Sequence, residues 1–234
     1  MESWAVGFEG DDDVERHAGI GTEAPAKPRL RVRMVSDYIC PWCFVGLARI
    51  ERLGEEFDLD LEACAYNLRP GVPPEGLPRD EAYRGRQFPE GYRERLRQTA
   101  REAGIEMISP PVVANTFKAH EATEFAAEQG QLRPFHRAVF EAYWERGENI
   151  GDIEVLCSIT AACGLDSHAL RQALAEDRYA QRVEDQMAWA RAAGLGGVPT
   201  FIFEENFALV GAQDYELFAD VARRIHSGAL KAEG

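Results

Sequence analysis

The stretch Leu30-Arg31-Val32-Arg33-Met34-Val35-Ser36-Asp37-Tyr38-Ile39-Cys40-Pro41-Trp42-Cys43 decides how this chain is expected to fold. Apolar and basic residues alternate over 30–35, with the two-residue period of a half-buried strand. Apolar residues then recur at helical spacing at Phe44, Leu47, Ile50 and Leu53. Cys40 therefore stands at a strand-to-helix junction. Pro41 takes the first helical position, where proline is favoured because its missing N–H is not needed.

The two thiols of Cys40 and Cys43 lie one helical turn apart on one face, close enough to form a disulfide. The unpaired N–H groups and the dipole at a helix N-terminus favour a negative charge. We therefore expect a stabilised thiolate at Cys40, and the thiolate is the attacking species. This pattern predicts thiol–disulfide exchange, with Cys40 as nucleophile and Cys43 as the thiol that resolves the mixed disulfide.

Half of a structural zinc site is the alternative interpretation of the same pair. Such a site needs four ligands, usually two cysteine pairs or one pair with spaced histidines. The remaining cysteines, Cys64, Cys157 and Cys163, are isolated, and no His-x-x-x-His follows. The spacing favours a redox pair over a metal site. We predict no metal and no bound cofactor, with glutathione or another small thiol open as a co-substrate.

Length and composition exclude several classes of protein. A chain of 234 residues holds one large domain or two small ones, and a hydrophobic content of 45% is normal for a globular core. A net charge of −14 disfavours nucleic acid and anionic membrane as partners. No apolar run reaches the length of a membrane span, and no secretory signal is visible, so a cytoplasmic protein is expected. Five cysteines fit a catalytic pair plus buried free thiols in a reducing compartment.

The chain divides into a sheet-forming part and a helical part. Residues 1–28 are acidic and poor in periodic apolar residues, which predicts a disordered tail. A strand at 30–36, a helix at about 41–56 and a strand at about 59–66 form a βαβ unit. The segment 67–79 is rich in proline and glycine and leaves the sheet.

From there to about residue 193 the pattern is helical, with no convincing strand. Helices are expected at 92–103, 116–129, around 135–144, at 152–163 with Asp152 as N-cap, a short one capped by Asp166 or Ser167, and at 177–193. The sheet resumes as a hairpin, with strands at 200–203 and 207–210, and a helix follows at 214–226. This order predicts an α/β protein, a thioredoxin-like fold with an inserted all-helical domain. The expected divisions are the tail 1–28, a thioredoxin-like domain of 29–67 and 177–230, and the helical insert 68–176.

Gly197-Val198-Pro199-Thr200 opens the first strand of the hairpin, where a proline is sterically allowed. A trans Val198–Pro199 bond is the ordinary alternative, since cis is the minority state. A cis bond would turn the backbone so that Val198 presents its N–H and C=O beside Cys40. A substrate chain could pair there as an added strand.

These motifs together resemble the DsbA-like thioredoxin-fold proteins, specifically the FrnE-like group, over residues 30–228. The resemblance rests on seven short segments: Asp37 to Cys43, Asn67 to Pro70, Asn115-Thr116, Ala119-His120, Phe140 to Trp144, Asp152 with Val155-Leu156, and Gly197 to Phe201. It implies a thioredoxin fold, a cis proline and dithiol–disulfide oxidoreductase activity carried by Cys40, Cys43, Val198 and Pro199.

A sister branch of this family gives a rival function. Proteins similar to 2-hydroxychromene-2-carboxylate isomerase and the kappa-class glutathione transferases share the architecture, bind glutathione near the same helix start, and often carry serine in place of the first cysteine. This sequence keeps both cysteines, which favours redox exchange. A third hypothesis is a non-catalytic interaction module that only keeps the fold.

The residues near the pair differ in the roles expected of them. Asp37 either accepts the proton of Cys43 or caps the turn before Cys40. Trp42, beside Pro41, is expected as an exposed contact for a protein or small-thiol substrate. His120 and the histidines at 136, 168 and 226 are assigned no chemistry, and the aromatic face around 135–144 is assigned to the core.

Overall fold

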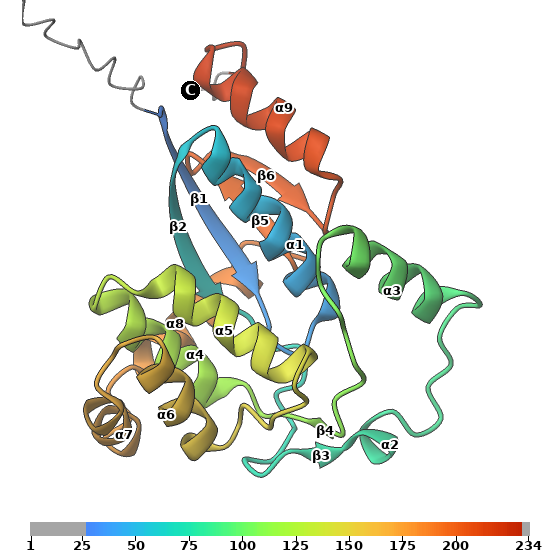
Figure 1. The fold of residues 1–234 in the computed structure, drawn as a ribbon, viewed down its shortest axis with the longest axis vertical. Helices are drawn as coiled ribbons and strands as arrows, with labels where there is room; N and C mark the ends of the chain where they lie inside the picture. Colours follow the sequence, from blue (N-terminus) through green and yellow to red (C-terminus); the bar gives the residue numbers. More distant parts are fainter. Residues whose placement is uncertain (1–26, 231–234) are drawn as a thin grey trace, which may run out of the picture.

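A four-stranded sheet forms the centre of the computed structural model, which describes residues 27–230 (Figure 1). The predicted tail 1–28 lies outside these residues except for its last two. The strands run in the order β2 (Asp58–Ala65), β1 (Arg29–Ser36), β5 (Thr200–Phe203) and β6 (Phe207–Val210). β1 is parallel to β2 and antiparallel to β5, and β5 and β6 form the hairpin. The predicted βαβ unit and the returning hairpin are confirmed.

The alternating apolar and basic residues of β1 lie on opposite faces of the strand, as predicted. Leu30, Val32 and Met34 are buried on one face of the strand. Arg31 and Arg33 point to the other face, where Arg31 pairs with Glu205 and Arg33 pairs with Glu62 at 3.0 Å. The basic residues are therefore placed where water and carboxylates reach them.

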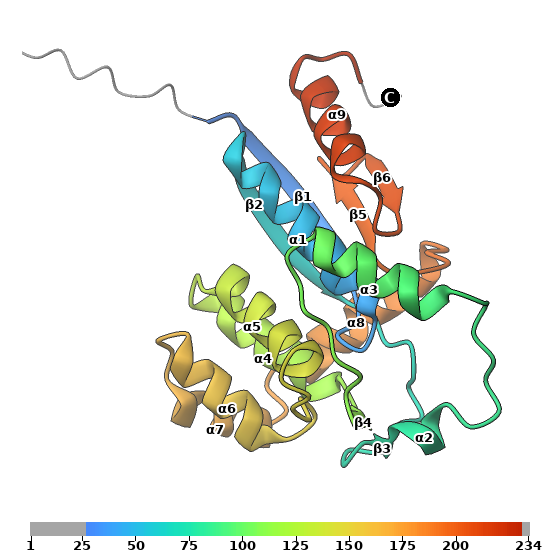
Figure 2. The same cartoon turned by 45° about the vertical axis from the view of Figure 1, so that its right-hand side comes forward.

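Helices cover both faces of the sheet. α1 (Pro41–Arg52), continued by the 3₁₀ turn η1 (Leu53–Glu55), lies beside α9 (Tyr215–His226) on one face (Figure 2). There Phe218 packs edge-on against Phe201, with ring centroids 4.8 Å apart. α8 (Ala180–Ala192) packs against the other face through a small buried cluster of Val35, Cys64 and Ala190.

Four further helices gather below the sheet in Figure 1: α4 (Phe117–Glu128), α5 (Leu132–Trp144), α6 (Ile153–Ala162) and α7 (Ser167–Ala175). The predicted caps are present, because Asp152 Oδ1 accepts from Glu154 N at 2.9 Å and Asp166 Oδ1 accepts from His168 N at 2.9 Å. The aromatic face of α5 is buried as predicted, with Phe135, Val139, Phe140, Tyr143 and Trp144 each less than 5% exposed.

Two sequence predictions are wrong. The segment 67–193 contains a two-stranded pair, β3 (Leu77–Pro78) with β4 (Val112–Val113), and strands of two residues are too short to show any period. The last helix of this segment begins at Ala180 rather than Asp177. The reason is that Asp177 has a φ of 50°, outside the helical region.

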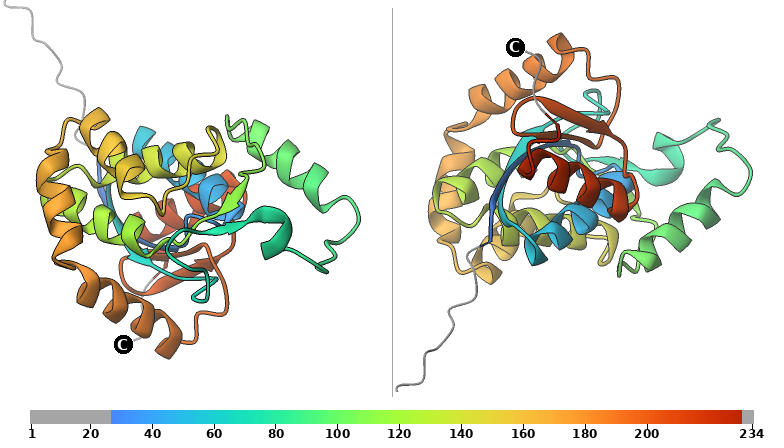
Figure 3. Two further views of the ribbon diagram at one scale, coloured as in Figure 1. Left: turned by 90° about the horizontal axis from the view of Figure 1, so that it is seen from below. Right: turned by 90° about the horizontal axis from the view of Figure 1, so that it is seen from above.

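The segment after β3 forms an arm, defined here as α2 (Arg79–Ala82), α3 (Tyr92–Glu102) and the loop between them. The arm projects to one side of the molecule (Figure 3), and α3 packs back against α1. Residues of the sheet, α1, α5 and α6 share one buried cluster, so the helical part and the sheet have a common core. The predicted domain boundaries stay a prediction. Within residues 27–230 no helix is both long and apolar enough to cross a membrane.

Candidate active site

The cysteine pair lies where β1 turns into α1. Cys40 is the N-cap of α1, in an extended conformation with φ −89° and ψ 113°, and Pro41 begins the helix as predicted. The turn before it is closed by Cys40 N, which donates to Asp37 O at 3.0 Å. Cys43 N donates to Cys40 O at 3.0 Å, which places the second thiol one turn along the helix.

The two thiols differ in their access to solvent. Cys40 is 7% exposed and Cys43 is fully buried, and both are free thiols. Burial raises the pKa of the Cys43 thiol well above its ordinary value, and the neighbouring Cys40 sulfur raises it further, against the opposing effect of a hydrogen bond with the Asp37 backbone. An incoming group can therefore reach only Cys40, while Cys43 stays protonated until a base accepts its proton. The predicted thiolate at Cys40 stays a prediction.

The proline loop, defined here as Gly197-Val198-Pro199-Thr200, lies far along the chain from the cysteine pair and contacts it. The Val198–Pro199 peptide bond is cis, which is the second of the two alternatives left open by the sequence. The Cys40 thiol faces the Val198 carbonyl, with Sγ and O 3.7 Å apart. Gly46 permits this approach, because a Cβ there would lie 2.8 Å from Phe201 Cζ and 3.1 Å from Pro199 Cγ. Residues 158 positions apart are thus brought into contact.

Asp37 is fully buried beside the pair and holds the turn before Cys40, while its role as acceptor of the Cys43 proton stays a prediction. Its Oδ2 accepts from Leu68 N at 2.7 Å, and its Oδ1 lies 3.4 Å from Ile39 N, so it holds the turn in place. Burial raises the pKa of this carboxyl to about 6, against the opposing effect of the Leu68 N–H. At neutral pH the carboxylate is mostly ionised and can accept a proton.

His120, to which the sequence assigned no chemistry, lies next to Asp37. Its Nε2 is 4.0 Å from Asp37 Oδ1 and donates to the Tyr66 carbonyl at 3.2 Å, since a carbonyl can only accept. Burial lowers the pKa of this imidazole to about 4, so it is neutral at pH 7. A neutral ring beside the carboxylate leaves Asp37 without a counter-charge there.

The proximity of Leu68 to Asp37 could have been predicted from the sequence. Parallel strands end at the same edge of a sheet, so the residues after β2 were bound to lie near those after β1. His120 had no such signal, because it reaches the site from a helix whose placement depends on tertiary packing.

Trp42 is half-buried rather than exposed. Its Nε1 donates to the Tyr92 hydroxyl at 3.1 Å, and the two rings meet edge-on with centroids 6.3 Å apart. The reason is the arm, because α3 packs against α1 and covers one side of the indole. Tyr92 was therefore missed as a neighbour of the site.

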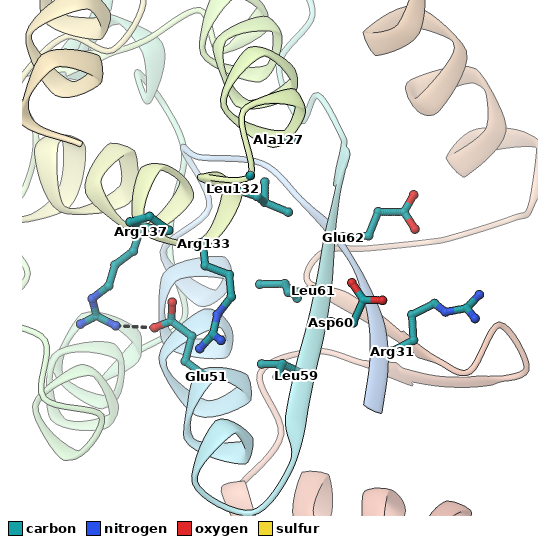
Figure 4. A pocket seen from close by; sticks show the side chains of 12 residues that line it. Arg31, Glu51, Leu59, Asp60, Leu61, Glu62, Ala127, Leu132, Arg133 and Arg137 are labelled. Carbon is teal, nitrogen blue, oxygen red and sulfur yellow. Dashed lines mark hydrogen bonds and ion pairs between the residues drawn. The ribbon is translucent and has the colours of Figure 1, made fainter. Parts of the chain in front are cut away.

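A hollow of about 810 Å³ lies elsewhere, between β2, α1 and α5 (Figure 4). It is lined near the amino ends of the strands by Arg31 and Asp60, whereas Cys40 follows the carboxyl end of β1. Part of its charge is already paired, since Arg137 Nη1 binds Glu51 Oε2 at 2.6 Å. The hollow is therefore separate from the cysteine pair.

The other cysteines lie away from the site. Cys64 belongs to the cluster under α8, and Cys157 donates to Ser167 O from the α6–α7 pair. Within the described chain no group of three or more His, Cys, Asp or Glu side chains is placed to hold a metal ion.

Comparison with known proteins points in the same direction. The family model described as "DSBA-like thioredoxin domain" matches residues 31–222. Uncharacterized protein YwbO of Bacillus subtilis (strain 168) is 30% identical over 194 residues, which is 81% of this chain and 94% of the relative.

Solved structures share the fold. A probable DsbA oxidoreductase, SCO1869 from Streptomyces coelicolor, has a TM-score of 0.77 and 25% identity, over 88% of this chain and 93% of that one. The 2-hydroxychromene-2-carboxylate isomerase has a TM-score of 0.67 and 19% identity, over 86% and 100%. The cytosolic disulfide reductase DsbM from Pseudomonas aeruginosa, solved with glutathione, has a TM-score of 0.61 and 16% identity, over 86% and 99%.

Proposed function

This chain belongs to the DSBA-like thioredoxin-domain family, and from that premise we propose that it is an enzyme that exchanges thiols and disulfides through Cys40 and Cys43. One observation carries the proposal. Cys40, the more accessible thiol, is the N-cap of α1, and its Sγ lies 3.7 Å from the Val198 carbonyl oxygen. The Cys43 thiol is buried one helical turn further along the chain. The membership of the narrower FrnE-like group stays a prediction.

The reaction needs two displacements. The Cys40 thiolate attacks one sulfur of a substrate disulfide, forms a mixed disulfide and releases the first substrate thiolate. The Cys43 thiol then loses its proton and attacks the Cys40 sulfur, which releases the second substrate thiolate. The protein dithiol is oxidised by two electrons and the substrate disulfide is reduced by two. The reverse sequence oxidises a substrate dithiol.

Asp37 is the base for the second displacement. Its carboxyl has a pKa of about 6, so it is ionised at neutral pH and lies in the same buried region as Cys43. The transferred proton neutralises Asp37 just as Cys43 becomes an anion, so the buried region gains no net charge. Because an additional charge in a low-dielectric site is costly, this exchange favours the resolving step.

Val198 positions the substrate backbone. In the reduced protein the Cys40 S–H donates a hydrogen bond to the Val198 carbonyl. When the thiol ionises, this hydrogen bond is lost and the carbonyl can accept one from a substrate. A substrate strand can then pair with the N–H and C=O of Val198, next to the attacking sulfur. The exchange needs no bound cofactor, because electrons pass between sulfur pairs. The buried free thiols fit a reducing compartment, which supports a cytoplasmic location.

Serine variants test the proposal. The oxidised dimer of a short cysteine peptide is mixed with the reduced protein in a single turnover without added thiol, and the released peptide thiol is measured. The wild-type protein is expected to release two peptide thiols, whereas Cys43→Ser is expected to release one and to keep the other as a one-to-one mixed disulfide at Cys40, visible as an added peptide mass. Cys40→Ser is expected to give neither product. Cys163→Ser, which removes a half-buried thiol elsewhere, is the matched control and should behave as wild type.

The same variants separate the rival functions. A glutathione-dependent isomerase would keep its isomerase activity in Cys43→Ser. A non-catalytic module would form no mixed disulfide in any variant, and Cys40 would be alkylated no faster than an ordinary thiol with a pKa of about 8.5.

A further inference from the structure

A small cavity lies beside the redox pair, between the arm and the body of the molecule. Pro41, the residue that follows the nucleophile, forms part of its wall, and its volume is about 80 Å³. The rest of the apolar wall includes Tyr83, Phe88, Tyr92, Leu96, Ile108 and Trp144. Since one water fills about 10–15 Å³ of such volume, the cavity has room for one ring or branched side chain.

The cavity is basic in a strongly acidic chain. Arg79, Arg93 and Arg97 line it, and none of the described lining residues is acidic. None of the three arginines forms an ion pair within residues 27–230, although the whole chain has a net charge of −14. Three unpaired guanidinium groups around an apolar cavity are complementary to an anion that carries an apolar body.

One guanidinium nitrogen of the lining residue Arg79 lacks a hydrogen-bond partner, and so does one of Arg69, a neighbour that does not line the cavity. Arg79 Nη1 and Arg69 Nη2 are buried atoms with no acceptor among the described residues. Both guanidinium groups lie against the same ring, with their carbons 4.9 Å and 4.4 Å from the centroid of Tyr83. A buried donor without an acceptor is costly, and an incoming carboxylate would supply acceptors.

The position of the cavity favours a polypeptide over a small thiol. Cys40 contacts Val198, where a substrate backbone pairs, and the next residue of the motif lines the cavity. One residue of an extended chain spans about 3.3 Å, so a side chain within two residues of the reacting cysteine reaches the cavity while the backbone stays on Val198. A small thiol held at Cys40 alone would leave the cavity empty.

We propose, building on the proposed function, that this cavity selects polypeptide substrates that carry an aromatic or branched residue within two positions of the reacting cysteine and a carboxylate beside it. Tyr83, Leu96 and their neighbours bind the apolar side chain, and Arg79 with Arg97 binds the carboxylate. The chemistry is unchanged: the Cys40 thiolate displaces one substrate thiolate, and Cys43 displaces the other.

Four oxidised peptide dimers test this specificity. All are capped at both ends and differ only near the cysteine, where an apolar position is Phe or Ala and an acidic position is Glu or Gln. Each is made with these positions before and after the cysteine, because the direction of the bound chain is open. The measured quantity is kcat/KM for dimer reduction by the wild-type protein with glutathione recycling. In the favoured direction the Phe/Glu dimer is expected to react about tenfold faster than the Ala/Gln dimer, in line with a charge-assisted hydrogen bond.

Variants assign the preference to the cavity. Arg79→Gln and, separately, the exposed Arg97→Gln should remove the advantage of Glu over Gln and keep the advantage of Phe over Ala. Leu96→Gln should remove the advantage of Phe over Ala and keep the advantage of Glu over Gln. Arg84→Gln removes an exposed arginine of the same arm that does not line the cavity, and should keep both preferences.

The outcomes separate this inference from the proposed function. Equal rates for all dimers, or a Glu preference that survives in both Arg79→Gln and Arg97→Gln, would overturn the specificity site while the oxidoreductase function stands. Glutathione disulfide reduced as fast as the Phe/Glu dimer would show that a small disulfide is the better occupant and would also overturn it. No reduction of any dimer would refute the proposed function itself.

Discussion

Asp37→Asn should change how the stability of this protein depends on pH. In the folded protein burial raises the pKa of the Asp37 carboxyl from 3.8 to about 6. In the unfolded chain the same carboxyl is in water and keeps its ordinary value. The folded state therefore holds a proton that the unfolded state has already lost between about pH 4 and pH 6. The contribution of Asp37 to stability therefore falls as the pH rises through this window and is constant above it.

The magnitude follows from the two pKa values. Each pKa unit corresponds to about 1.36 kcal/mol, so a rise from 3.8 to about 6 costs the wild-type protein about 3 kcal/mol above pH 7. Asparagine keeps the shape and neutral charge of the protonated carboxyl and does not titrate. The difference in free energy of unfolding, variant minus wild type, should therefore increase by about 2–3 kcal/mol between pH 4 and pH 8. Any constant cost of the amide cancels in this comparison.

Urea unfolding of both reduced proteins at several pH values measures the difference. Asp58→Asn is the matched control, since its side chain is exposed at the start of β2 and stays in water in both states. A variant-minus-wild-type difference for Asp37→Asn that stays flat from pH 4 to pH 8 would refute the placement of Asp37 as a buried, uncompensated carboxylate. The same variant should also slow the resolving step, measured as a longer-lived mixed disulfide at Cys40.

Two further substitutions test the packing that positions the site. Gly46→Ala would gain about 1 kcal/mol from helix propensity, but its Cβ would meet the Phe201 ring at 2.8 Å, and overpacking costs about 1–3 kcal/mol, so urea unfolding should show a net loss. An equally or more stable Gly46→Ala protein would contradict the close approach of the proline loop to α1. Asp166→Ala removes the cap of α7 and should lower the free energy of unfolding by about 1 kcal/mol, whereas Asp166→Asn should keep most of it; equal losses in the two variants would contradict the cap.

Local signals in the sequence were sufficient for much of the fold. The alternation at 30–35, the proline after Cys40 and the spacing of the two cysteines each depend on a few neighbouring residues, and the structure has the strand, the helix start and the thiol pair where they were predicted. The contact of Cys40 with Val198 joins distant parts of the chain. The residues alone left a cis and a trans Val198–Pro199 bond open, and the cis bond that places Val198 beside Cys40 was implied by the family resemblance.

Other features depend on tertiary packing and had no local signal. His120 reaches Asp37 through the placement of α4, and Trp42 is covered because α3 folds back against α1. The cavity beside Pro41 is built by residues from the arm and from α5, none of which follows a recognisable spacing. The pair β3–β4 is too short for a period of two to be visible.

The central claim is that Cys40 and Cys43 form one reversible disulfide in the folded protein. Equilibration with glutathione buffers of increasing oxidation, followed by acid quenching, alkylation and mass spectrometry of peptides, tests it most directly. We predict a single two-electron transition in which these two cysteines lose their thiols together, while Cys64, Cys157 and Cys163 stay alkylatable. A pair that stays reduced at every ratio, or a disulfide that joins either cysteine to one of the other three, would contradict the account.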